Sequence, residues 1–107
     1  HLNPLDRSAL RSILTQPKNS IIKQYVKLFE MEDIKVSFSD EALDFIVDKA
    51  VEFSLGARGL RSICEAIMLE PMYDLPSNDS VKELEIDLEF VKKQFDNAVD
   101  SRKLRVA

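Results

Sequence analysis

Apolar residues recur along most of this chain at spacings of three and four, the pattern of helices that bury one face. Five segments show this pattern. Short polar side chains stand at the expected N-cap positions of three of them, Asp6, Ser39 and Asp87. The first predicted helix follows Asp6 and ends at Thr15, and the second runs from Lys18 to Met31. The third follows Ser39 and ends at Ser54, and the last follows Asp87 and ends at Val99. The fourth runs from Ala57 to Pro71, where the proline kinks or ends the helix.

Two shorter segments alternate apolar and polar residues with a period of two, as half-buried strands do. Residues 34–38 read Ile-Lys-Val-Ser-Phe, and Val81 to Ile86 alternates more weakly. A loop over Leu75 to Ser80 precedes the second of these segments. Helices and strands that pack together in this order predict a compact α+β domain, with four or five helices and a small sheet of two or three strands.

The composition fits one globular domain of 107 residues, with 45% hydrophobic and 32% charged residues. No apolar run approaches the ~20 residues that a membrane span needs, and no signal-peptide pattern opens the chain. A net charge of −4 argues against nucleic acid as the main partner, because such modules carry a basic face. The first residue is His1 and not Met, so we expect a piece of a longer protein.

Residues for catalysis or metal binding are scarce. Cys64 is the single cysteine and His1 the single histidine, which excludes a disulfide framework, a cysteine zinc site and histidine-based catalysis. Cys64 lies on an apolar helix face and is expected to be buried, in a protein of a reducing compartment. No phosphate loop is present. We assign no catalytic or metal-binding residue and do not expect a stand-alone enzyme. Four acidic residues are expected on a solvated helix face without a calcium-loop pattern: Asp40, Glu41, Asp44 and Asp48.

One segment breaks local rules. Gly56 and Gly59, the chain's two glycines, flank Arg58 at the first turn of a predicted helix. A cation there is disfavoured by the helix dipole, by up to ~1 kcal/mol, unless an anion lies in front of it. On spacing alone the pattern slightly favours the alternative, in which Gly56 is a C-cap and Arg58 pairs with a carboxylate on the surface. Arg61, one turn later, is predicted to pair with Glu65.

Three strings, taken together, resemble one family, the ClpX-type AAA+ unfoldases. Leu14–Ser20, with Gln24-Tyr25, resembles the segment that follows their interdomain hinge. Gly56–Ile63 resembles their sensor-2 motif, and Met72–Ser77 resembles the end of the sensor-2 helix. HslU-type unfoldases share the first string and the Gly-Ala-Arg but usually lack the rest. The similarity extends roughly from Leu5 to Asp87, and nothing is carried over beyond it.

The resemblance implies that residues 1–107 are the C-terminal small domain, or lid, of a hexameric ATP-driven unfoldase, with residues 1–6 as the end of the interdomain hinge. Three residues match nucleotide-binding positions. Arg58 matches the sensor-2 arginine, which reaches the terminal phosphates of ATP. Leu5 matches a hinge residue that packs on the adenine, and Ile13 matches a second apolar contact there. Plain core packing is the alternative for Leu5 and Ile13.

The resemblance also implies what lies outside this chain. The large domain holds the phosphate loop and Mg²⁺, so the fragment alone is expected to be inactive and the parent protein to be an ATPase. The implied partners are that large domain, neighbouring subunits of a homohexamer, protein substrates and the ClpP peptidase, without nucleic acid or membrane. Bacterial cytoplasm is the expected location and the mitochondrial matrix the second possibility. The alternative function is a nucleotide-independent helical interaction module, in which Arg58 and Arg61 bind an acidic partner.

Overall fold

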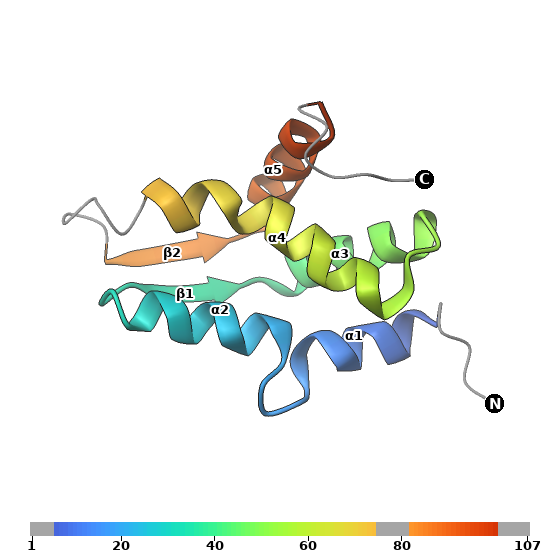
Figure 1. Ribbon diagram of the computed structural model, residues 1–107, viewed down its shortest axis with the longest axis horizontal. Coiled ribbons are helices and arrows are strands. Elements are labelled where there is room, and N and C mark those ends of the chain that lie inside the picture. Colours follow the sequence, from blue (N-terminus) through green and yellow to red (C-terminus); the bar gives the residue numbers. More distant parts are fainter. Residues whose placement is uncertain (1–5, 75–81, 101–107) are drawn as a thin grey trace.

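Figure 1 presents the computed structural model of the chain, which describes residues 6–74 and 82–100. The described part contains five helices and one two-stranded sheet, which confirms the predicted α+β class. The predicted loop over 75–80 and the residue Val81 lie outside the described residues. The elements in chain order are α1 (Arg7–Thr15), α2 (Ile21–Glu30), β1 (Lys35–Phe38), α3 (Asp40–Glu52), α4 (Gly56–Asp74), β2 (Glu83–Ile86) and α5 (Leu88–Asp100).

Side-chain caps set the starts of four helices. Each capping oxygen accepts a hydrogen bond from a backbone N–H of the first turn, a group that has no partner within the helix. Three of these caps are the predicted ones: Asp6 accepts from Ser8 (2.8 Å), Ser39 from Ala42 (3.1 Å) and Asp87 from Phe90 (2.9 Å).

The start of α2 differs from the prediction. The helix begins at Ile21 and not at Lys18, because Ser20 is its N-cap. The Ser20 hydroxyl accepts from the N–H of Lys23 at 3.3 Å, and the N–H of Ser20 donates to the carbonyl of Pro17 at 2.9 Å. Residues 17–20 therefore form a turn between α1 and α2.

The two strands run parallel, side by side, with Lys35 opposite Glu83 and Phe38 opposite Ile86 (Figure 1). Parallel strands need a crossover connection, and here the connection contains α3 and α4. Figure 1 shows α2 beside β1, and the two elements are in contact.

A single apolar core receives side chains from every element. Helix α4 lies at its centre and buries Leu60, Ile63 and Ile67 completely. Cys64, 1% exposed, belongs to the same face, as predicted, and this burial raises the pKa of its thiol to about 12. Pro71 does not end α4, which continues to Asp74; Pro71 is itself buried in the core. No helix in the described ranges is long and apolar enough to span a membrane.

Candidate functional site

The junction between α3 and α4 positions the candidate site. Helix α3 ends in a Schellman motif, in which the N–H of Leu55 donates to the carbonyl of Ala50 (2.9 Å) and the N–H of Ser54 to that of Val51 (3.0 Å). Ser54 is left-handed, with φ of 54°. The C-cap of α3 is Phe53 and the left-handed residue that follows it is Ser54, so Gly56 does not have the C-cap role that the sequence alternative gave it.

The two glycines have separate structural reasons. Gly56 opens α4 with φ of 65°, a conformation that favours glycine. Gly59 is buried one turn on, where an added Cβ would lie 2.0 Å from the Cβ of Leu55. The side chain of Leu55 thus folds against the first turn of α4 and requires a residue without Cβ there. Both glycines fix the backbone that carries Arg58.

Arg58 is exposed on the first turn of α4 and has no ion pair or hydrogen bond to any residue of the described ranges. The first turn of α4 contains no acidic residue. The alternative in which a nearby carboxylate neutralises Arg58 is therefore not found here. An unpaired guanidinium beside the positive end of a helix makes a suitable site for a phosphate or carboxylate, because the guanidinium and the helix N-terminus attract the same anion.

The other two predicted contact residues have different outcomes. Ile13 lies on α1, which packs against α4, and its side chain is 42% exposed. Leu10 and Leu14 of the same helix are buried, at 1% and 0%. Ile13 is thus available to a ligand, and the core-packing alternative is wrong for it; its contact with adenine stays a prediction. Leu5 lies outside the described residues.

The predicted ion pair between Arg61 and Glu65 is not formed. Both side chains instead line a groove of about 530 Å³ between α2 and α4, together with Tyr25. The pair has the weaker helical orientation, with the cation N-terminal to the anion, and even a favourable exposed pair contributes only about 0.2–0.5 kcal/mol. Partial burial, then Cys64 and Glu65, raise the pKa of Tyr25 to about 12, and Arg61 opposes them.

A cluster of ion pairs between α1 and α3 was not foreseen. Arg11 pairs with Asp40 and Asp44, and Arg7 pairs with Asp48. These acidic residues are exposed or half-exposed, as predicted, but they are not simply solvated, because the basic residues of α1 neutralise them. Within the described ranges, no group of three or more His, Cys, Asp or Glu side chains could hold a metal ion.

Comparison with known proteins connects this geometry to a family. The family model for the C-terminal, D2-small domain of ClpB protein matches residues 5–90. Similar proteins include the ATP-dependent Clp protease ATP-binding subunits ClpX of three bacteria. That of Bacteroides thetaiotaomicron is 57% identical over 107 residues, all of this chain and 25% of the relative. Those of Bacteroides fragilis and Porphyromonas gingivalis are 60% identical over 98 residues and 66% over 77.

These two alignments cover 92% and 72% of this chain, and 23% and 19% of the two relatives. The chain thus spans about a quarter or less of the length of the relatives that it matches. The resemblance drawn from the three sequence strings is confirmed. The chain belongs to the D2-small family of AAA+ C-terminal domains, in the form that ClpX proteins carry.

Proposed function

We propose that this domain is the nucleotide-sensing lid of an ATP-dependent protein unfoldase. One observation carries the proposal: Arg58 is exposed at the N-terminus of α4 and has no counter-ion among residues 6–74 and 82–100. A guanidinium and the N–H groups of a first helical turn match the oxygens of a phosphate. The names of the relatives, ATP-binding subunits of an ATP-dependent protease, support ATP as the source of that phosphate.

The lid would work by preferring one state of the nucleotide. Residues 1–6 end the hinge, and Leu5 and Ile13 give the adenine an apolar contact. Arg58 holds the terminal phosphate. This contact favours the closed arrangement only if Arg58 binds ATP better than it binds ADP and free phosphate. A charge-assisted contact of about 1.5–3 kcal/mol changes the ratio of closed to open forms roughly ten- to a hundredfold.

The rest of the machinery belongs to other parts of the parent protein. The large domain would hold the phosphate loop and Mg²⁺, and neighbouring subunits of a homohexamer would transmit the lid's rotation around the ring. The assembly would unfold protein substrates and deliver them to the ClpP peptidase in the bacterial cytoplasm, with the mitochondrial matrix as the second location. The parent ClpX-type chain, and not this domain alone, would be the ATPase.

The experiment compares the parent protein with its Arg58→Ala variant and with Lys92→Ala, which removes an exposed lysine of α5. We expect Arg58→Ala to reduce ATP turnover at least about tenfold while ATP binding is largely retained, because the contact acts on the closed state. Lys92→Ala should match wild type. Unchanged turnover in Arg58→Ala would contradict the proposal.

A second function has one observation in its favour. Arg61 is also exposed and, like Arg58, has no ion pair in the described part of the chain. Both arginines could serve a nucleotide-independent module that binds an acidic partner. The reading frame of the parent protein separates the two functions, because the lid requires a phosphate loop and an Asp-Glu Walker B pair upstream of residue 1.

A further inference from the structure

Three phenylalanine rings and one lysine meet where α5 lies against the end of α3. The ammonium of Lys49 lies near three ring centres, those of Phe45 (5.3 Å), Phe53 (6.0 Å) and Phe95 (5.5 Å). A cation at such distances is attracted to the face of an aromatic ring. Glu52 also pairs with this ammonium, at 3.2 Å. Lys49 thus stabilises a group of rings that comes from both helices.

The ring of Phe95, on α5, lies at the centre of this group and is buried, with 4% of the residue exposed. The ring of Phe53 stacks on it, with the ring centres 6.2 Å apart and the planes at 24°. The ring of Phe45 meets it edge to face, at 5.8 Å and 81°. Aromatic pairs favour both of these arrangements. Phe95 therefore contacts two rings that lie about two helical turns apart along the chain.

Phe53 differs from Phe45 in its place along the chain. It is the C-cap of α3, and its N–H donates to the carbonyl of Lys49 at 3.0 Å. The turn into α4 begins at the next residue, the left-handed Ser54. A serine in this conformation has a steric cost, so the conformation persists only where surrounding contacts hold it. The stacked ring of Phe95 is one such contact, immediately before the junction that carries Arg58.

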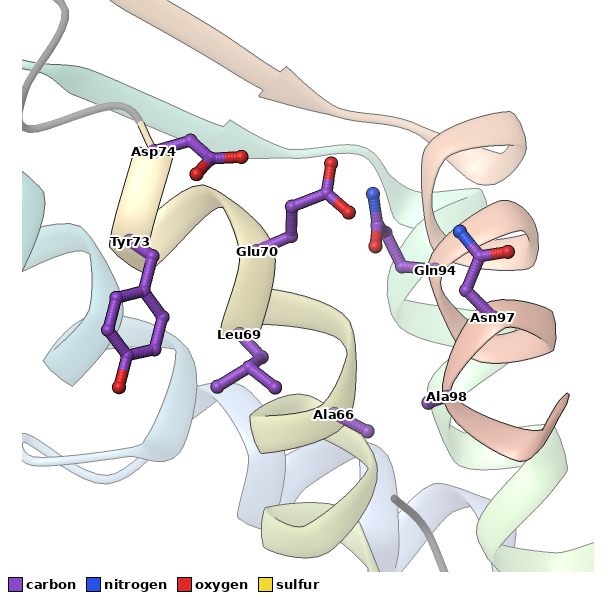
Figure 2. A pocket seen from close by; sticks show the side chains of 8 residues that line it. All are labelled: Ala66, Leu69, Glu70, Tyr73, Asp74, Gln94, Asn97 and Ala98. Atoms are coloured by element: carbon purple, nitrogen blue, oxygen red, sulfur yellow. The ribbon is translucent and has the colours of Figure 1, made fainter. Parts of the chain in front are cut away.

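Helix α5 also contacts the other helix of this junction, because it packs against α4 as well as α3. Figure 2 shows Ala66 of α4 and Ala98 of α5 directed toward each other, beside a pocket of about 290 Å³ that both helices line. Ala98 is buried there. Helix α5 thus packs on both helices that the junction connects, and this packing constrains the angle between them.

We propose that Phe95 is a positioning residue for Arg58 and acts through its stacking on Phe53. The inference rests on the proposed nucleotide-sensing function and adds the contact that orients the sensing residue. A functional side chain must be held within about 0.5 Å of its working position, and a displacement of about 1 Å can lower a rate a hundredfold. Phe95 lies beyond residue 90, where the match to the D2-small model ends, so membership of the family does not by itself imply this role.

The experiment uses the parent protein and replaces the rings by leucine. Phe53→Leu and Phe95→Leu each remove the stacked pair. Phe45→Leu is the matched control, because it removes another half-buried ring that contacts Phe95 but lies two turns before the junction. Phe53→Tyr keeps the stacked ring and should behave as wild type.

Hydrogen exchange measures the junction without involving the nucleotide. We expect the amides of residues 54–59 to exchange at least about threefold faster in the two stacking variants than in wild type or in Phe45→Leu. The amides of α2 should exchange at the wild-type rate, which shows that each variant is folded. Equal exchange of residues 54–59 in all these proteins would overturn the inference, whatever the nucleotide experiments show. So would an equal increase in α2, because it would mean a general loss of stability.

ATP turnover then tests the connection to Arg58. Phe53→Leu should lower kcat about three- to tenfold and leave KM for ATP within about twofold, because Arg58 acts in the closed state. Phe45→Leu should match wild type. In an Arg58→Ala background Phe53→Leu should have no further effect, since it acts through the missing guanidinium.

The two proposals fail in different ways. An unchanged kcat in Phe53→Leu beside a reduced kcat in Arg58→Ala would overturn the positioning role and leave the nucleotide-sensing function intact. A further loss of turnover when Phe53→Leu is added to Arg58→Ala would do the same. An unchanged kcat in Arg58→Ala alone would contradict the nucleotide-sensing function and the positioning role with it.

Discussion

Arg11 of α1 donates from Nη2 to Oδ1 of Asp40, at the start of α3, over 2.9 Å. The same guanidinium also pairs with Asp44, one turn further along α3. One side chain thus connects α1 to the first two turns of a helix distant in sequence. Arg58 has no comparable contact within the described ranges. The arginines therefore divide into those that hold helices together and those left available to a ligand.

This division predicts opposite effects on stability. Arg11→Ala should lower the free energy of unfolding by about 0.5–1 kcal/mol at low salt, because it removes two partly exposed ion pairs, and by less at high salt. Arg58→Ala should not lower it, and should raise it by up to ~1 kcal/mol, because it removes a cation from the positive end of α4. Urea unfolding at two salt concentrations measures both variants. An equal loss in the two variants would show that Arg58 has a structural partner.

A second prediction concerns Gly59. Helix propensity alone would make Gly59→Ala stabilising by about 1 kcal/mol. We expect the opposite, a loss of about 1–3 kcal/mol, because the new Cβ meets the Cβ of Leu55 and the helix start must move. Ser62→Ala, at an exposed position of the same helix, is the control and should cost little. A more stable Gly59→Ala protein in thermal unfolding would refute the close approach of Leu55.

The two left-handed residues of the α3–α4 junction give a matched pair. Ser54→Gly should stabilise the protein by about 0.5–1 kcal/mol, because glycine adopts positive φ without the steric cost that serine has. Gly56→Ala should destabilise it by about 1–2 kcal/mol for the same reason. Thermal unfolding of both variants checks the pair. If both substitutions shift Tm in the same direction, the junction does not have this geometry.

The pH dependence of stability should reflect two weak acids, the buried Cys64 thiol and the partly buried Tyr25 hydroxyl. Burial raises the pKa of Cys64 from about 9.0 to about 12, and that of Tyr25 from about 10.0 to about 12. The unfolded chain therefore loses these protons first, so stability falls as pH rises from 9 toward 12. Between pH 9 and 10 the fall comes mainly from Cys64, so Cys64→Ala should flatten it there, whereas Tyr25→Phe should not. Urea midpoints measured at pH 8, 9 and 10 decide this, and identical slopes in all three proteins would contradict it.

The sequence predicted the features that depend on neighbouring residues. The three caps, the alternation in β1 and the buried face of α4 all follow from spacing within one element. Lys18 was wrongly placed in a helix because the apolar spacing does not mark where α2 starts, which the cap by the Ser20 hydroxyl determines. The ion pairs of Arg11 depend on how α1 packs against α3, which the periodicity of either helix does not encode.

The candidate site was partly visible for a related reason. Arg58 could be found because it violates a local electrostatic preference, which is itself a local signal. Ile13 shares the apolar stripe of Leu10 and Leu14, and a stripe does not reveal which of its edges faces solvent. Phe95 looks like any apolar residue of an amphipathic helix. Its stacking on the C-cap residue of α3 appears only once α5 lies against α3.

The parallel pairing of β1 and β2 has a consequence for the order of folding. Strand β1 cannot join its partner until α3 and α4 have been made and the chain has turned back on itself. Bringing together the two ends of so long a connection costs conformational entropy of the chain, and no contact between the strands offsets this cost until they meet. We therefore expect the sheet to form late. During synthesis on the ribosome, Val36 must wait for Leu84 and Ile86 to emerge. Until then the N-terminal helices lack part of the core that buries their apolar faces. A chaperone could bind these faces before the C-terminal elements are synthesised.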